Sequence, residues 1–277
     1  MGLYVPEYGV DVAVSFEGGG RMSEVRIRRY VFLVLLLFSS TVLFAQKKSL
    51  HVIYIGDSIT AGAGLSDPSV EAPPVIASDY LKKQAGIDNV LFSNQGHSGF
   101  TTVDFLPGGN AFKLAEVAAS GYANRPGIMV FSVMLGTNDS AIKGPNGSPV
   151  APENYGKNLK IIIDQLLKDY PGCKIIINHP VWYSPNTYNG AQYLQEGLDR
   201  LQSYFPVIKG LVSSYATTNK GQIFLGDTKA FDFFKKNYLN NFQSENGHQG
   251  TFYLHPNATG AKALGDFWGA GIYAVVK

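Results

Sequence analysis

The sequence has very little cysteine: among its 277 residues only Cys173 carries a thiol, which excludes a disulfide within the chain. Cys173 opens the apolar stretch Lys174 to Asn178. Free cysteine in such surroundings is usually a small buried side chain. A nucleophilic thiol would need a histidine partner, and the sequence has no paired histidine motif to support that alternative. We therefore expect Cys173 to be structural.

The chain also lacks an excess of charge of either sign. It has 23 Lys and Arg against 21 Asp and Glu, a formal net charge of +2, and no block of basic residues. Nucleic acids and anionic membranes are bound through clustered Lys and Arg, so we expect neither as a partner.

Motifs for metals and nucleotides are missing as well. His51, His97, His179 and His248 are scattered, without the paired spacing of metal ligands. The glycines from Gly56 to Gly64 fit neither GxGxxG nor a phosphate-binding loop. We therefore expect no metal and no cofactor.

Long apolar runs are limited to the N-terminus. Arg26, Arg28 and Arg29 precede an apolar stretch from Tyr30 to Phe44, and Ala45 provides a small residue for cleavage. This pattern predicts a signal peptide over residues 22–45 and a secreted or periplasmic protein without a membrane partner once the leader is removed. The stretch is shorter than the roughly 20 residues that span a bilayer, although an uncleaved anchor is the alternative.

Residues 1–21 show no periodicity and precede a second methionine, Met22. We expect either that Met22 is the true start or that residues 1–21 are an unstructured leader. The remaining residues, 49–277, suit one domain, because the chain is 45% hydrophobic and 16% charged and needs no second core.

Apolar β-rich runs alternate with helical patterns along this domain. The clearest helix is Tyr155 to Tyr170, whose apolar residues recur at helical spacing before Pro171 and Gly172. Another helix is expected from Asn257 to Val276. Repeated strand and helix units predict an α/β fold, a three-layer sandwich around a central, mainly five-stranded parallel sheet. The expected strands are 50–55, 90–92, 128–134, 174–177 and 222–225.

The first of these strands ends in Gly56-Asp57-Ser58-Ile59-Thr60. Ligands of open α/β sheets bind beyond the carboxyl ends of the strands, so Ser58 lies where a substrate is expected. A serine hydroxyl needs a base to become a nucleophile, and the reaction needs donors for the oxyanion. The simpler alternative is that Asp57 or Ser58 only caps a helix.

Three further blocks follow in order: Asn94 to Gly99, Gly136 to Asp139, and His255 to Asn257. With Gly56 to Ile59, the chain from Ser49 onward resembles the SGNH (GDSL-like) hydrolase superfamily. The resemblance implies a flavodoxin-like fold, Ser58 as nucleophile and His255 as general base. It also implies an oxyanion hole made by Ser58, Gly99 and Asn138.

The chemistry of ester hydrolysis asks for such residues independently. Backbone N–H groups of Ser58 and Gly99 and the amide of Asn138 would stabilise a tetrahedral oxyanion, and losing one such donor typically costs about 2.7 to 4 kcal/mol. The alternative for Asn138 is an ordinary turn residue after a strand.

One position departs from the family pattern. The resemblance implies an aspartate three residues before the base histidine, yet Phe252 stands there. Either a backbone carbonyl orients His255, or a carboxylate from elsewhere does so, with Glu245, Asp227 and Asp232 as candidates. The departure also favours a rival hypothesis, a binding cleft that has lost turnover.

The substrate is less well indicated. Trp182 and Tyr183 follow the fourth expected strand and either stack on a sugar or pack their loop. His97 either faces the substrate or bonds to backbone. Because the chain is similar to carbohydrate esterases, including sialate and xylan O-acetylesterases, we expect a secreted serine esterase that removes acetyl from a small-molecule or glycan ester. Alternatives are a broader lipase-like or lysophospholipase-like esterase and an inactive glycan-binding domain. The sequence leaves the oligomeric state open.

Overall fold

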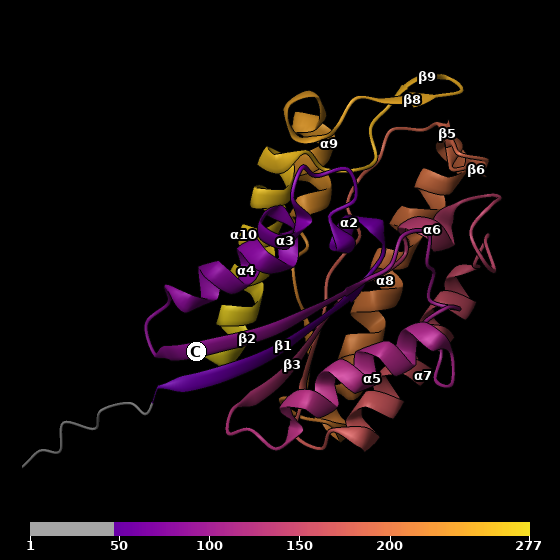
Figure 1. Cartoon of the computed structure of the whole chain (residues 1–277). Helices are drawn as coiled ribbons and strands as arrows, with labels where there is room; N and C mark the ends of the chain where they lie inside the picture. The colour runs from indigo at the N-terminus through magenta and orange to yellow at the C-terminus, as the bar shows by residue number, and fades with distance from the viewer. Residues whose placement is uncertain (1–46) are drawn as a thin grey trace, which may run out of the picture. The chain divides into compact units, whose positions relative to one another are not determined.

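The computed structural model describes residues 47–277, so the expected leader and signal peptide, 1–45, lie outside the described residues. The described chain forms a five-stranded sheet in the order β2-β1-β3-β4-β7, with every neighbouring pair parallel. Helices cover both faces: α4 and α10 lie on one side, and α5, α7 and α8 on the other (Figure 1). This is the three-layer α/β sandwich expected from the sequence.

The strands of this sheet are β1 (Lys48–Gly56), β2 (Ile87–Gly96), β3 (Ile128–Met134), β4 (Lys174–Ile177) and β7 (Ile223–Leu225). Two short hairpins lie outside it, made by β5 (Thr187–Tyr188) with β6 (Ala191–Gln192) and by β8 (Glu245–Gly247) with β9 (Gly250–Phe252). The longer helices are α4 (Pro73–Lys82), α5 (Asn110–Ala123), α7 (Pro152–Asp169), α8 (Leu194–Thr218), α9 (Ala230–Asn241) and α10 (Ala258–Val276). Single-turn helices are α2 (Ser58–Ala61), α3 (Pro68–Glu71) and α6 (Thr137–Ser140).

The central strands are apolar because both of their faces are covered. In β1, the residues from Leu50 to Ile55 are buried, and β3 and β4 are buried in the same way over most of their length. Strand β2 runs over Ile87–Gly96 and is longer than the expected strand 90–92. The prediction was too short because β2 is an edge strand, and its half-buried polar residues do not produce a continuous apolar run.

Helix α10 packs closely on α4 because it carries glycines at the contact. A Cβ on Gly265 would lie 2.5 Å from Ile76 Cβ, and one on Gly269 would lie 2.7 Å from Tyr80 Cδ1. Asn257 begins the helix by accepting a hydrogen bond from the backbone N–H of Gly260 at 3.0 Å. The cap and the close packing together fix where the chain just before α10, including His255, meets the carboxyl edge of the sheet.

No helix within residues 47–277 is long and apolar enough to cross a membrane.

Candidate active site

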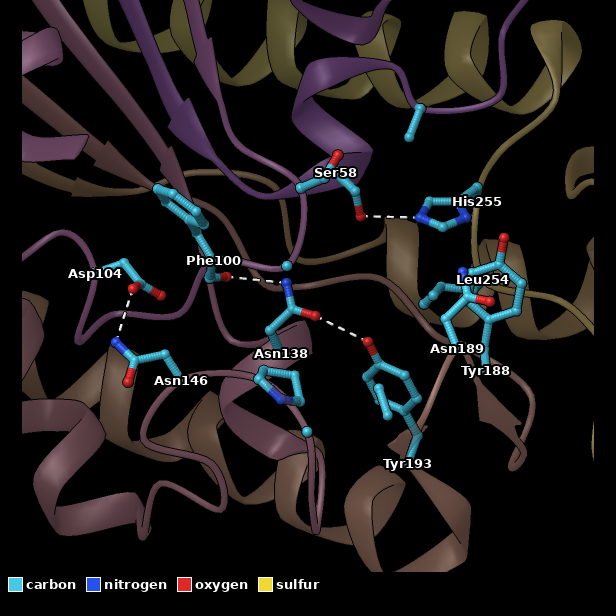
Figure 2. A pocket seen from close by; sticks show the side chains of 16 residues that line it. Ser58, Phe100, Asp104, Asn138, Asn146, Tyr188, Asn189, Tyr193, Leu254 and His255 are labelled. Atoms are coloured by element: carbon cyan, nitrogen blue, oxygen red, sulfur yellow. Dashed lines mark hydrogen bonds between the residues drawn. The ribbon is translucent and has the colours of Figure 1, made fainter. Parts of the chain in front are cut away.

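The residues singled out from the sequence meet at the carboxyl edge of the sheet. Ser58 begins α2 directly after β1, Gly99 follows β2, and Asn138 lies in α6 after β3. His255 lies just before α10 and reaches the same edge (Figure 2). Strands β2, β1 and β3 are neighbours, so three segments distant in sequence deliver their polar residues to one pocket.

A sharp turn after β1 presents Ser58. A Cβ on Gly56 would lie 2.0 Å from Thr60 Oγ1 and 2.8 Å from the carbonyl oxygen of Met134, so only glycine fits there. Asp57 caps α2 through its Oδ1, which accepts from the backbone N–H of Ile59 at 2.9 Å. The capping function thus belongs to Asp57, and the hydroxyl of Ser58 is left to face the histidine.

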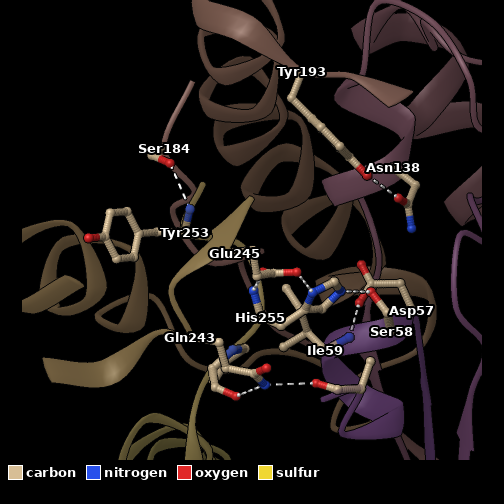
Figure 3. A network of polar contacts seen from close by, with 12 residues as sticks. Asp57, Ser58, Ile59, Asn138, Ser184, Tyr193, Gln243, Glu245, Tyr253 and His255 are labelled. Atoms are coloured by element: carbon tan, nitrogen blue, oxygen red, sulfur yellow. Dashed lines mark hydrogen bonds and ion pairs between the residues drawn. The ribbon is translucent and has the colours of Figure 1, made fainter. Parts of the chain in front are cut away.

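A chain of hydrogen bonds connects Ser58, His255 and Glu245. Ser58 Oγ lies 2.9 Å from His255 Nε2, and His255 Nδ1 lies 2.9 Å from Glu245 Oε2 (Figure 3). The other carboxylate oxygen, Glu245 Oε1, accepts from the backbone N–H of His255 at 3.1 Å. The histidine and glutamate side chains are each only 11% exposed. This arrangement can remove the proton of Ser58 and stabilise the resulting imidazolium.

The partner of His255 Nδ1 is therefore a carboxylate, that of Glu245, and not a backbone carbonyl. Asp227 instead accepts from the backbone N–H groups of Lys229 and Ala230, each at 3.0 Å, at the start of α9. Asp232 is an exposed residue of α9.

The register of the β8–β9 hairpin accounts for the position of the acid. Glu245 pairs directly with Phe252, the residue that stands where an aspartate was expected. The carboxylate is supplied from the opposite strand of the same hairpin. Phe252 is fully buried and packs against Tyr188 and Tyr193, with ring centroids 5.9 and 5.7 Å apart, so it holds the hairpin down.

Asn186 anchors this hairpin to the rest of the domain. Its Nδ2 donates to the carbonyl oxygen of Gly250 at 3.1 Å, and its Oδ1 accepts from the backbone N–H of Gln249 at 2.9 Å. Asn186 is 1% exposed, and it precedes β5. The hairpin that carries Glu245 is thus tied to the one that carries Tyr188.

The amide of Asn138 is held from both ends. Its Nδ2 donates to the carbonyl oxygen of Phe100 at 2.9 Å, and its Oδ1 accepts from the hydroxyl of Tyr193 at 2.8 Å. Burial raises the pKa of Tyr193 far above its ordinary value, so its hydroxyl stays a donor. The second Nδ2 hydrogen of Asn138 is left for a ligand.

Gly99 completes the set and lines the same pocket as Ser58 and Asn138. Its φ of 81° lies in the left-handed region, where a side chain would strain the backbone.

Two buried carboxyls lie directly beside the site residues. Burial raises the pKa of Asp57 to about 6 and that of Asp139 to about 7. Asp139 accepts from the backbone N–H of Thr102 at 3.0 Å and also from its hydroxyl. This contact ties the turn that holds Asn138 to the loop that holds Gly99.

The pocket has a volume of about 640 Å³. Beyond Ser58, Gly99, Asn138 and His255, its lining residues are Ala63, Ser98, Phe100, Asp104, Gly144, Pro145, Asn146, Tyr188, Asn189, Ala191, Tyr193 and Leu254. Phe100, Tyr188 and Tyr193 therefore supply its aromatic walls.

Trp182 and Tyr183 do not reach this pocket. They are 8% and 0% exposed, and the Tyr183 hydroxyl lies 2.9 Å from Ser140 Oγ. Of the two alternatives for Trp182 and Tyr183, the structure shows packing of their loop. Tyr188, from the same loop, lines the pocket instead. His97 does not line the pocket either. Its ring stacks on Phe100 with 5.1 Å between ring centroids, and its backbone N–H donates to the carbonyl oxygen of Gly56 at 3.0 Å.

Cys173 is buried, as expected, and burial raises its pKa to about 12. Within residues 47–277, no group of three or more His, Cys, Asp or Glu side chains is placed to hold a metal ion.

Comparison with known proteins identifies matches for both sequence and fold. The model of the GDSL-like lipase/acylhydrolase family matches residues 54–263. No curated protein matches the chain.

Several solved structures share the fold at low identity. The carbohydrate acetylesterase Est24 from Sinorhizobium meliloti is 18% identical, with 83% of this chain and 100% of that chain covered and a TM-score of 0.55. The M. smegmatis aryl esterase is 15% identical, with coverages of 81% and 99% and a TM-score of 0.53. A catalytic mutant of Axe2, an acetylxylan esterase from Geobacillus stearothermophilus, is 18% identical, with coverages of 83% and 94% and a TM-score of 0.54.

The contact between Glu245 and His255 predicts the effect of Glu245→Gln. The neutral amide cannot stabilise the imidazolium and can hold the ring in the wrong tautomer, so we expect kcat on an aryl acetate to fall by about 10² to 10⁴. Asp232→Asn, which removes an exposed carboxylate from α9, serves as the control and should keep wild-type kcat. A Glu245→Gln enzyme within twofold of wild type would show that this carboxylate does not assist the histidine.

The contact between Tyr193 and Asn138 gives a second prediction. Tyr193→Phe removes the hydroxyl that fixes the amide, so kcat should fall about tenfold while KM stays within about twofold. Tyr183→Phe removes another buried hydroxyl close by, one bonded to Ser140, and should have little effect. In an Asn138→Ala background, Tyr193→Phe should cause no further loss. Additive losses in the double variant would mean that Tyr193 acts without Asn138.

Proposed function

The chain belongs to the GDSL-like lipase/acylhydrolase family and is a serine hydrolase acting on carboxylic esters, and we propose that it removes short acyl groups, above all acetyl, from a carbohydrate or sialic acid. The observation that carries this proposal is the hydrogen-bonded series Ser58, His255 and Glu245 at the wall of a pocket that also contains Gly99 and Asn138.

In the first half of the reaction, Ser58 Oγ attacks the ester carbonyl carbon while His255 Nε2 takes the hydroxyl proton. The carbonyl oxygen becomes an oxyanion that accepts from the Asn138 amide and from the backbone N–H groups of Ser58 and Gly99. Glu245 stabilises the imidazolium. His255 then returns the proton to the sugar oxygen as the carbon–oxygen bond breaks, leaving an acyl group on Ser58.

In the second half, water replaces the sugar. His255 takes a proton from the water, the hydroxide adds to the acyl carbon, and the same donors stabilise the second oxyanion. His255 protonates Ser58 Oγ as the bond between serine and acyl group breaks. A carboxylic acid is released and the free serine is restored.

The chemistry of the pocket lining favours a polar leaving group. Its residues include the side-chain amides of Asn138, Asn146 and Asn189 together with the aromatic rings of Phe100, Tyr188 and Tyr193. The choice of acetyl as the acyl group is supported by the names of two structural neighbours, a carbohydrate acetylesterase and an acetylxylan esterase. The bond between Ser58 and His255 favours turnover over an inactive glycan-binding domain.

The pattern of residues 22–45 also supports a secreted or periplasmic enzyme. We expect the mature chain to begin near Gln46. N-terminal sequencing of protein recovered from the culture medium or periplasm tests this, and a mature chain that begins at or before Met22 would contradict it.

Acyl-chain selectivity and the nucleophile are tested together. The kcat/KM for p-nitrophenyl esters should be highest for acetate and fall as the chain lengthens, and the enzyme should release acetate from an acetylated sugar. Ser58→Ala should abolish both activities and retain the wild-type melting temperature, because its hydroxyl carries chemistry and little packing. A preference for esters of about eight carbons or more would favour the lipase-like alternative.

A further inference from the structure

A polar corner closes the pocket at the wall opposite His255, and no step of the reaction uses it. Asp104 and Asn146 form this corner, with Asn146 Nδ2 donating to Asp104 Oδ1 at 2.8 Å (Figure 2). Asp104 Oδ2 accepts from the backbone N–H of Thr101 at 2.8 Å, and Thr101 is fully buried. The hydroxyl of Thr101 also donates to the carbonyl oxygen of Asn146 at 2.8 Å. Asp104 is therefore held in place by its contacts with Thr101 and Asn146, independently of any ligand.

The described residues that line the pocket include an acidic side chain that no Lys or Arg among them balances. Asp104 carries a carboxylate at this corner, and Glu245 carries a second behind His255. Among the described residues, those that line the pocket include no lysine or arginine. Lys143 precedes the lining residue Gly144, but its side chain is exposed and is not part of the lining. A substrate carboxylate or phosphate bound beside Asp104 would meet its negative charge, and no Lys or Arg among the described lining residues would offset that repulsion.

The same corner can bind uncharged hydroxyl groups. Asn146 has its side-chain carbonyl and one Nδ2 hydrogen left after its bond to Asp104, and Asp104 is a strong acceptor for a hydroxyl donor. Phe100 and Tyr188 also line the pocket and supply aromatic surface for contact with a sugar.

We propose that the carbohydrate this enzyme deacylates is uncharged, with sugar hydroxyls bound by Asp104 and Asn146, and that Asp104 rejects esters of anionic sugars such as sialic acids and of phosphate-bearing lipids. The proposal rests on the proposed function and decides between the substrate classes that function leaves open. Asp104 is a specificity residue, placed to act on the leaving group of the ester while Ser58 and His255 act on its acyl carbon.

A matched pair of substrates tests the proposal. A methyl hexopyranoside and the corresponding methyl hexopyranosiduronate, acetylated at the same position, differ only in a CH₂OH group against a carboxylate. At low ionic strength the wild-type kcat/KM should favour the uncharged sugar by about tenfold or more. Asp104→Asn keeps the shape of the side chain and should lower this ratio at least about threefold. A general loss of activity in the variant lowers kcat/KM for both sugars alike, so it does not change the ratio between them.

Asp88→Asn is the control, since it removes an exposed carboxylate at the start of β2, the opposite end of the strand from the site, and should leave the ratio unchanged. Added salt should lower the wild-type ratio, because it screens the repulsion, and this measurement holds even if Asp104→Asn fails to fold.

The outcomes separate the two proposals. A wild-type ratio near or below one, or a ratio unaffected by both Asp104→Asn and salt, overturns the charge selection while carbohydrate deacylation stands. An enzyme that cleaves p-nitrophenyl acetate but neither sugar overturns both.

Discussion

The two hydrogen bonds between Glu245 and the single residue His255 are the interaction on which the site depends. One carboxylate oxygen holds the backbone of the histidine and the other holds its ring, so the position and the rotation of the imidazole are fixed together. A single bond to Nδ1 would fix the ring alone. In the proposed reaction, this orientation of the base is what allows the neutral Ser58 beside it to act as a nucleophile.

Part of this site could be predicted from the sequence. Ser58 could be found from the residues alone, because it follows a buried strand in a run of small and polar residues. Gly99, Asn138 and His255 were expected from the resemblance of their sequence blocks to those of the SGNH (GDSL-like) hydrolases. The strands could be predicted where both faces are covered, as in β1 and β3, and less well at the edge strand β2.

The acid and the orienting tyrosine depend on contacts between distant segments, which local patterns do not record. Glu245 was one of three candidate carboxylates, and only the pairing of β8 with β9 brings it to His255. Tyr193 precedes a helix in a stretch without any motif, and its role follows from the path of the chain. The same cause explains why the sequence left two alternatives open for Trp182 and Tyr183. The path of their loop decides whether an aromatic ring contacts the substrate or packs in the core, and the sequence does not record that path.

Because Glu245 pairs with Phe252, the length of the turn between β8 and β9 affects the position of the carboxylate. Only His248 and Gln249 separate the two strands of that hairpin. Side chains alternate between the two faces of a strand, so a shift of the register by one residue would turn Glu245 to the other face without changing any catalytic residue. Insertions and deletions at this tip, which surface loops ordinarily tolerate, are therefore as constrained in this protein as the acid itself.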